Sequence, residues 1–73
     1  MTREERIAIT AQAVNSYRDG LDISDDELKV AISELRHIVQ FLDYLFPYYS
    51  LAANPLRRVL HEFEDFKRAR GLK

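Results

Sequence analysis

The stretch ISDDELKVAISELRHIVQFLDYLF, residues 23–46, decides the fold of this chain. It opens with a strong helix start, because the Ser24 hydroxyl can accept a hydrogen bond from the amide of Glu27 while the Glu27 side chain reaches back to Ser24. Ile23 and Leu28 flank this capping box as a hydrophobic staple. A helix should therefore begin directly after Ser24, and the acidic residues of its first turn favour the positive end of the helix dipole.

Pro47 is the first residue that can end this helix, because proline disfavours helical geometry at the residue before it. The pattern predicts a helix over residues 25–46, about 33 Å long at 1.5 Å per residue. One face is apolar along the whole length and is wide enough to pack against two other helices. We expect this inner face to consist of Leu28, Ala31, Ile32, Leu35, Ile38, Val39, Leu42, Leu45 and Phe46.

Apolar side chains also occupy a neighbouring face of the same helix, where Val30, Phe41 and Tyr44 lie with His37 between them. The polar positions are left in one narrow line, which consists of Lys29, Ser33, Arg36, Gln40 and Asp43. A helix that is apolar around most of its circumference is normally surrounded by other helices. Two short helices from one chain can cover only part of it, so we expect something else to cover the rest.

A shorter helix over residues 3–18 precedes the central one. Thr2 and Glu5 form a second capping box at its start, and Gly20 supplies a left-handed stop after its end, with Leu21 placed to fold back on the last turn. The spacing of its apolar residues predicts one buried stripe, which consists of Ile7, Ala11, Val14 and Tyr17.

The last helix is expected over residues 55–70, with Asn54 as its N-cap and Pro55 at its first position. Gly71 follows it as a stop. Residues 47–53, PYYSLAA, could form a separate helical turn or a bend before it. The apolar stripe of the last helix consists of Leu56, Val59, Leu60, Phe63 and Phe66.

Three helices with short connections and no alternating pattern of a strand predict a single all-α domain over residues 1–73. The expected architecture is a three-helix bundle with a long central helix and a short kinked or helical segment before the last helix. A core of this size stabilises a fold by only about 3–5 kcal/mol. The chain has no cysteine, so disulfides cannot reinforce it, and oligomerisation is the expected reinforcement.

Composition excludes several classes of protein. Hydrophobic residues make up 47% and charged residues 32% of the chain, which is typical of a globular protein rather than a disordered one. No apolar run approaches the length that spans a bilayer, and the start MTREERIAIT has no apolar signal region after its charges. We therefore expect a cytoplasmic protein with no membrane association.

Five of the eight aromatic residues lie between residues 41 and 49, beside two arginines that begin the last helix. Tyrosine and arginine are enriched at protein interfaces, because they combine a large contact area with a polar end. We expect a partner-binding surface, with a homodimer favoured, formed by Phe41, Tyr44, Tyr48, Tyr49, Arg57 and Arg58. The alternative is that residues 47–53 fold back as a lid and bury these rings within one molecule.

Two other binding functions remain open. Residues 55–73 hold six bases against three acids, which suggests phosphate contacts with nucleic acid through Arg57, Arg58, Lys67, Arg68 and Arg70. The net charge of −1 and the long second helix disfavour that alternative. A nucleotide could also bind between subunits in a pocket formed by Tyr44, Tyr48, Tyr49 and Arg57.

Catalytic, metal and cofactor sites are not expected. His37 and His61 have neither a second histidine four residues away nor a cysteine, as a local metal site would require. The acids after Ser24 have a sufficient role at the helix start, and the glycine and ligand spacing of a calcium loop are missing. No glycine-rich phosphate loop or nucleophile with an adjacent base is present.

The expected function is therefore non-enzymatic: a self-associating protein that acts as an adaptor or inhibitor of a larger protein. A phage or mobile-element accessory factor is one example of such a protein.

Overall fold

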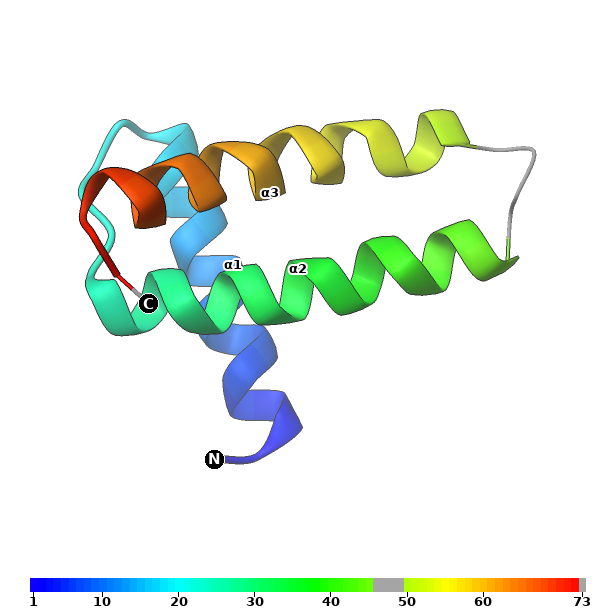
Figure 1. Ribbon diagram of the computed structural model, residues 1–73. Helices are drawn as coiled ribbons and strands as arrows, with labels where there is room; N and C mark the ends of the chain where they lie inside the picture. Colours follow the sequence, from blue (N-terminus) through cyan, green and yellow to red (C-terminus); the bar gives the residue numbers. More distant parts are fainter. Residues whose placement is uncertain (46–49, 73) are drawn as a thin grey trace.

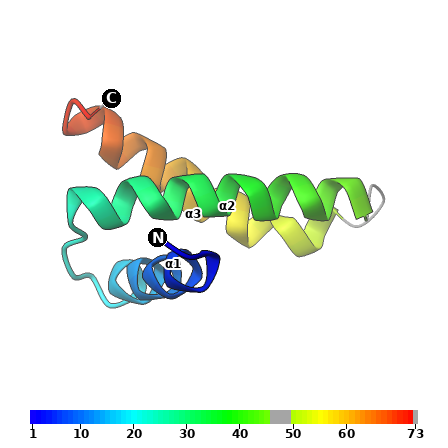
Figure 2. The same ribbon diagram turned by 90° about the horizontal axis from the view of Figure 1, so that it is seen from below.

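The computed structural model describes residues 1–45 and 50–72, and the side chains of residues 1–45 and 55–72. These residues form three helices and no strand, which confirms the all-α three-helix architecture. The helices are α1 (Arg3–Arg18), α2 (Asp25–Leu45) and α3 (Ser50–Ala69). In Figure 1, α2 and α3 lie side by side and antiparallel, and α1 crosses them. The same arrangement seen from below, in Figure 2, shows that the far end of the α2/α3 pair extends past α1.

The predicted starts of the first two helices are confirmed. The amide of Glu5 donates a hydrogen bond of 3.1 Å to the Thr2 hydroxyl, and the amide of Glu27 donates one of 3.2 Å to the Ser24 hydroxyl. Each bond satisfies one of the backbone amides that a helix leaves unpaired at its first turn. The starts of α1 and α2 are therefore set by local chemistry.

The predicted stop after α1 is also present. Gly20 has a φ of 73°, in the left-handed region that favours glycine. Its amide donates to the Tyr17 carbonyl oxygen, and the amide of Leu21 donates to the Ser16 carbonyl oxygen, the two bonds of a Schellman motif. The Leu21 side chain itself stays 63% exposed, so it does not bury the last turn as expected.

The core lies where α1 and α3 both pack on the first half of α2. Phe63 of α3 is completely buried, and its ring meets Tyr17 of α1 edge-on with a centroid distance of 5.6 Å. Such a geometry is favourable for aromatic pairs. The buried apolar side chains of the described residues are Ala13, Ile23, Leu28, Ala31, Ile32, Leu35, Val39 and Phe63.

The predicted buried stripe of α1 is wrong in part. Ile7 is 48% exposed and Ala11 is exposed, whereas Thr10 and Ala13 are buried. Thr10 can be buried because its hydroxyl donates a 2.8 Å hydrogen bond to the Arg6 carbonyl oxygen of its own helix. Val14 and Tyr17 of the predicted stripe do pack against the core, partly buried, so α1 is rotated only part of the way from the predicted orientation.

The predicted start of the last helix is also wrong. α3 begins at Ser50, so Pro55 lies inside the helix and Asn54 is not its N-cap. Continuing a helix through a proline removes one backbone hydrogen bond, whereas a break would leave several backbone groups to be capped. The side chains of residues 50–54 lie outside the described part, as does residue 46, where the second helix was expected to end.

Candidate functional site at the end of α2

The second half of α2 carries an uncovered apolar surface. Tyr44 is 83% exposed, Phe41 62% and Leu45 46%. Ile38 and Leu42 of the same helix are half-buried. These five residues, called here the α2 end patch, include a stripe with helical spacing from residue 38 to residue 45. Leu45 was expected to belong to the buried face, and its exposure is a correction.

The short length of α1 explains why the patch is uncovered. α1 crosses α2 near the middle, and the far end of the α2/α3 pair continues beyond it (Figures 1 and 2). α3 lies against a different side of α2, where Arg36 and Asp43 of α2 pair with Glu64 and Arg57 of α3. The side of α2 that α1 contacts at Glu34 is therefore largely open at Phe41 and Leu45 among the described residues.

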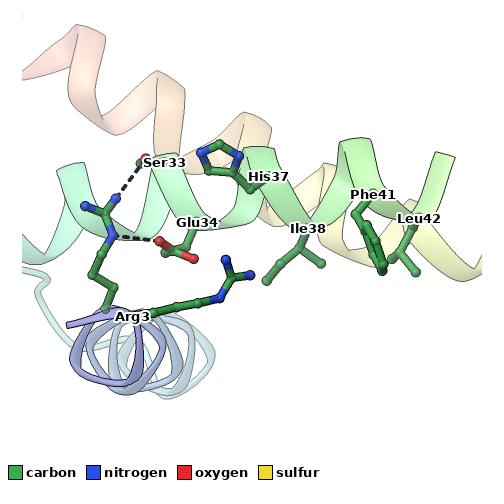
Figure 3. Close-up of a pocket in the computed structure, with 8 residues that line it drawn as sticks. Arg3, Ser33, Glu34, His37, Ile38, Phe41 and Leu42 are labelled. Atoms are coloured by element: carbon green, nitrogen blue, oxygen red, sulfur yellow. Dashed lines mark hydrogen bonds and ion pairs between the residues drawn. The ribbon is translucent and has the colours of Figure 1, made fainter. Parts of the chain in front are cut away.

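An open cleft of about 690 Å³ lies where the start of α1 meets this patch. It is lined by Arg3, Arg6, Ser33, Glu34, His37, Ile38, Phe41 and Leu42. Figure 3 shows the Arg3 side chain extending below Glu34 toward Ile38, with Phe41 and Leu42 further along α2. No carboxylate in the described part of the chain pairs with Arg3. The cleft thus combines a guanidinium with apolar walls.

One side of this cleft is fixed by a charged hydrogen-bond network between α1 and α2. Arg6 Nε donates to Glu34 Oε1 at 2.6 Å, and an Arg6 terminal nitrogen donates to Ser33 Oγ at 2.9 Å, as drawn in Figure 3. The Glu34 side chain is only 7% exposed and that of Arg6 is 35% exposed. A carboxylate buried to this degree needs a cation or several hydrogen-bond donors, and Arg6 supplies the cation and one charged hydrogen bond.

Four of the six predicted partner-binding residues lie in the described part of the chain. Phe41 and Tyr44 are exposed together on α2, and Arg58 is exposed on α3. Arg57 instead donates to Asp43 of α2 and so joins the two helices. Tyr48 and Tyr49 lie outside the described residues. The nucleotide pocket expected from Tyr44, Tyr48, Tyr49 and Arg57 is therefore described only for Tyr44 and Arg57.

Three of the five basic residues named for nucleic acid form ion pairs with carboxylates of the chain. Besides the pairing of Arg57, a terminal nitrogen of Arg70 donates to the Ile23 carbonyl oxygen at 2.7 Å and to Asp25 Oδ1 at 2.9 Å. Arg68 lies 3.4 Å from Asp65 of its own helix. Of the five cations named for nucleic acid, only Arg58 and Lys67 have no carboxylate partner within the described ranges.

Sequence reasoning missed the pairing of Arg6 with Glu34. A signal for it was present, because Glu34 lies between Ala31 and Ile38 on the apolar side of α2 and a buried carboxylate requires a cation. His37 lines the cleft and His61 is exposed. No group of three or more metal-ligating side chains occurs among the described residues.

None of the helices in the described ranges is long and apolar enough to cross a membrane. Comparison of the chain with protein-family models, curated proteins and solved structures gave no significant match.

Proposed function

We propose that this protein acts by binding protein, and that its first partner is a second copy of itself, bound through the α2 end patch. The observation that carries the proposal is the exposure of Phe41, Tyr44 and Leu45 together at one end of the molecule. Large apolar side chains gathered on a soluble protein mark interaction sites, whereas single exposed ones do not. Tyrosine suits such a site because its ring packs while its hydroxyl stays hydrated.

A second copy is favoured because the patch lies beside an apolar groove that it could fill. The groove, of about 300 Å³, is lined mainly by apolar side chains of all three helices, and Ile38 borders both groove and patch. Its other apolar lining residues are Ile7, Ala11, Val14, Leu35 and Leu56. In a two-fold symmetric dimer both molecules use the same surface. The α2 end patch of each molecule could therefore pack into the apolar groove of the other.

Dimerisation would also add to the stability of a fold whose core is small. A single core in a chain of 73 residues contributes only a few kcal/mol of net stability. Covering the patch would remove additional apolar surface from water, at about 25 cal/mol per Å². We propose that the assembled protein works in the cytoplasm as an adaptor or inhibitor of a larger protein, with no catalytic step of its own.

The proposal predicts that a charge placed in the patch prevents association. Phe41→Glu and Tyr44→Glu should each raise the dimer dissociation constant by at least about tenfold, because an ionised carboxylate must lose water to enter an apolar contact. Sedimentation velocity over a range of concentrations measures the change.

Leu21→Glu is the matched control. Leu21 is 63% exposed, about as much as Phe41, but it lies in the connection between α1 and α2, away from the patch. The control variant should associate like the wild type. Equal weakening by Leu21→Glu and Phe41→Glu, or no effect of either patch variant, would contradict the proposed interface.

A further inference from the structure

A second cleft, of about 290 Å³, lies between α2 and α3. It is formed along the narrow polar line of α2 and closed on one side by Lys67 of α3. Ile32, which is 3% exposed, contributes its apolar floor. The remaining lining residues are Lys29, Ser33, Arg36, His37 and Gln40. Every polar side chain of this set can donate a hydrogen bond.

The cleft concentrates positive charge in an otherwise acidic part of the chain. Residues 19–46 contain seven acids and only two bases, and both bases, Lys29 and Arg36, line this cleft. Lys67 brings a third cation from the other helix, and no carboxylate is among the lining residues. Three cations that converge without a lining anion repel one another, so an anion bound among them would be stabilised.

The hydrogen-bond donors in this cleft remain available to a ligand. Neither Lys29 nor Lys67 pairs with a carboxylate of the described chain. One terminal nitrogen of Arg36 lies 3.3 Å from Glu64 Oε1, but a guanidinium has five N–H donors. Ser33 Oγ accepts a bond from Arg6, which leaves its own hydrogen free to donate.

We propose that this cleft binds a phosphate group, either as the free ion or as the monoester of a small molecule. A phosphate monoester carries a charge of about −1.5 to −2 at neutral pH and presents three acceptor oxygens. Two ammonium groups and a guanidinium, from two helices, can each contact one of them, whereas a carboxylate has only two acceptor oxygens. The cleft is near the lower limit of volume for small-ligand sites, which suits a phosphate with a small attached group.

This site is independent of the proposed self-association. Arg36 and Ile38 are two residues apart, so their side chains point about 200° from each other around the helix. The phosphate cleft therefore opens on a different side of α2 from the end patch, although His37 lies between the two. A protein that fails to dimerise can still bind phosphate, and the two results can be distinguished.

An NMR titration of the full chain with inorganic phosphate tests the proposal. The backbone amide shifts should concentrate at residues 29–40 of α2 and around Lys67 of α3. Lys29→Ala and Lys67→Ala should each raise the phosphate dissociation constant by at least about tenfold, the size expected when a charged hydrogen bond is lost. Sodium chloride at equal ionic strength should not reproduce the shifts. Circular dichroism checks that each variant is folded.

Arg58→Ala is the matched control, because it removes one positive charge from an exposed position of the same helix, outside the cleft. It should change the dissociation constant by no more than about twofold. A nucleoside monophosphate that binds more tightly than inorganic phosphate, with the same two lysines required, would identify the monoester as the better ligand. Equal weakening by Arg58→Ala, or shifts spread over all the cations, would overturn the proposal.

Discussion

Replacing Phe63 by alanine should leave the chain largely unfolded at 25 °C. Phe63 is completely buried and joins α3 to Tyr17 of α1, so its removal leaves a cavity where all three helices meet. Truncation of a buried phenylalanine costs about 3–5 kcal/mol. That loss equals the total stability expected for a single core of this size. Circular dichroism with urea titration should show the helical signal lost and no cooperative transition.

Phe66→Ala provides the control for this prediction. Phe66 lies three residues further along α3 and is 36% exposed, with its ring centroid 6.2 Å from that of Phe63. The same chemical change there should lower the free energy of unfolding by only about 1 kcal/mol, because much of the ring is already in water. If the two variants lose similar stability, Phe63 is not the centre of the core.

The second large effect is expected from Arg6→Ala, which removes the cation that neutralises Glu34. The Glu34 carboxylate would stay buried without its partner, and the cost should be about 2–3 kcal/mol in the free energy of unfolding. Chemical denaturation measures the loss. The double variant Arg6→Met with Glu34→Leu should recover a large part of it, because it removes the unpaired buried charge.

Arg3→Ala is the control for the second effect. It removes the same side chain from the same helix, but Arg3 is exposed and pairs with no carboxylate of the described residues. Its effect should stay within about 0.5 kcal/mol. A loss for Arg6→Ala as small as that for Arg3→Ala would show that water reaches Glu34 well enough to replace the ion pair.

The parts of the fold that depend on nearby residues could be predicted from the sequence. The starts of α1 and α2 depend on a hydroxyl three residues from the amide that it accepts, and the stop after α1 depends on a glycine with positive φ. These interactions form within one turn of helix, so the residues that make them are readable as short motifs. The breadth of the apolar surface on α2 could also be predicted, because it depends only on the spacing of residues within that helix.

The orientation of α1 could not be predicted in the same way. Apolar spacing favoured a stripe that includes Ile7 and Ala11, but the buried residues of α1 are Thr10 and Ala13, and Arg6 forms an ion pair with α2. Only Val14 and Tyr17 of that stripe pack against the core. The orientation of α1 depends on Glu34 of α2, which is 28 residues from its partner Arg6 in the sequence. Local spacing contains no information about such a partner, and small side chains that allow close packing contribute little to a hydrophobic pattern.

The two candidate sites also differ in whether they could be predicted from the sequence. Phe41 and Tyr44 were expected to exceed what the chain can cover, because that expectation depends only on counting apolar faces. The phosphate cleft needs Lys67 of α3 beside Lys29 and Arg36, and this juxtaposition appears only when the two helices are placed together. The sequence predicts the polar line of α2 but not which side chains of α3 lie beside it.

The molar mass of the wild-type chain in solution, measured as a function of concentration, tests most directly whether the α2 end patch binds a second copy of the protein. Sedimentation equilibrium from micromolar to several hundred micromolar should show the mass rising from 8.6 kDa toward twice that value. A constant mass of one chain over the whole range would contradict the claim.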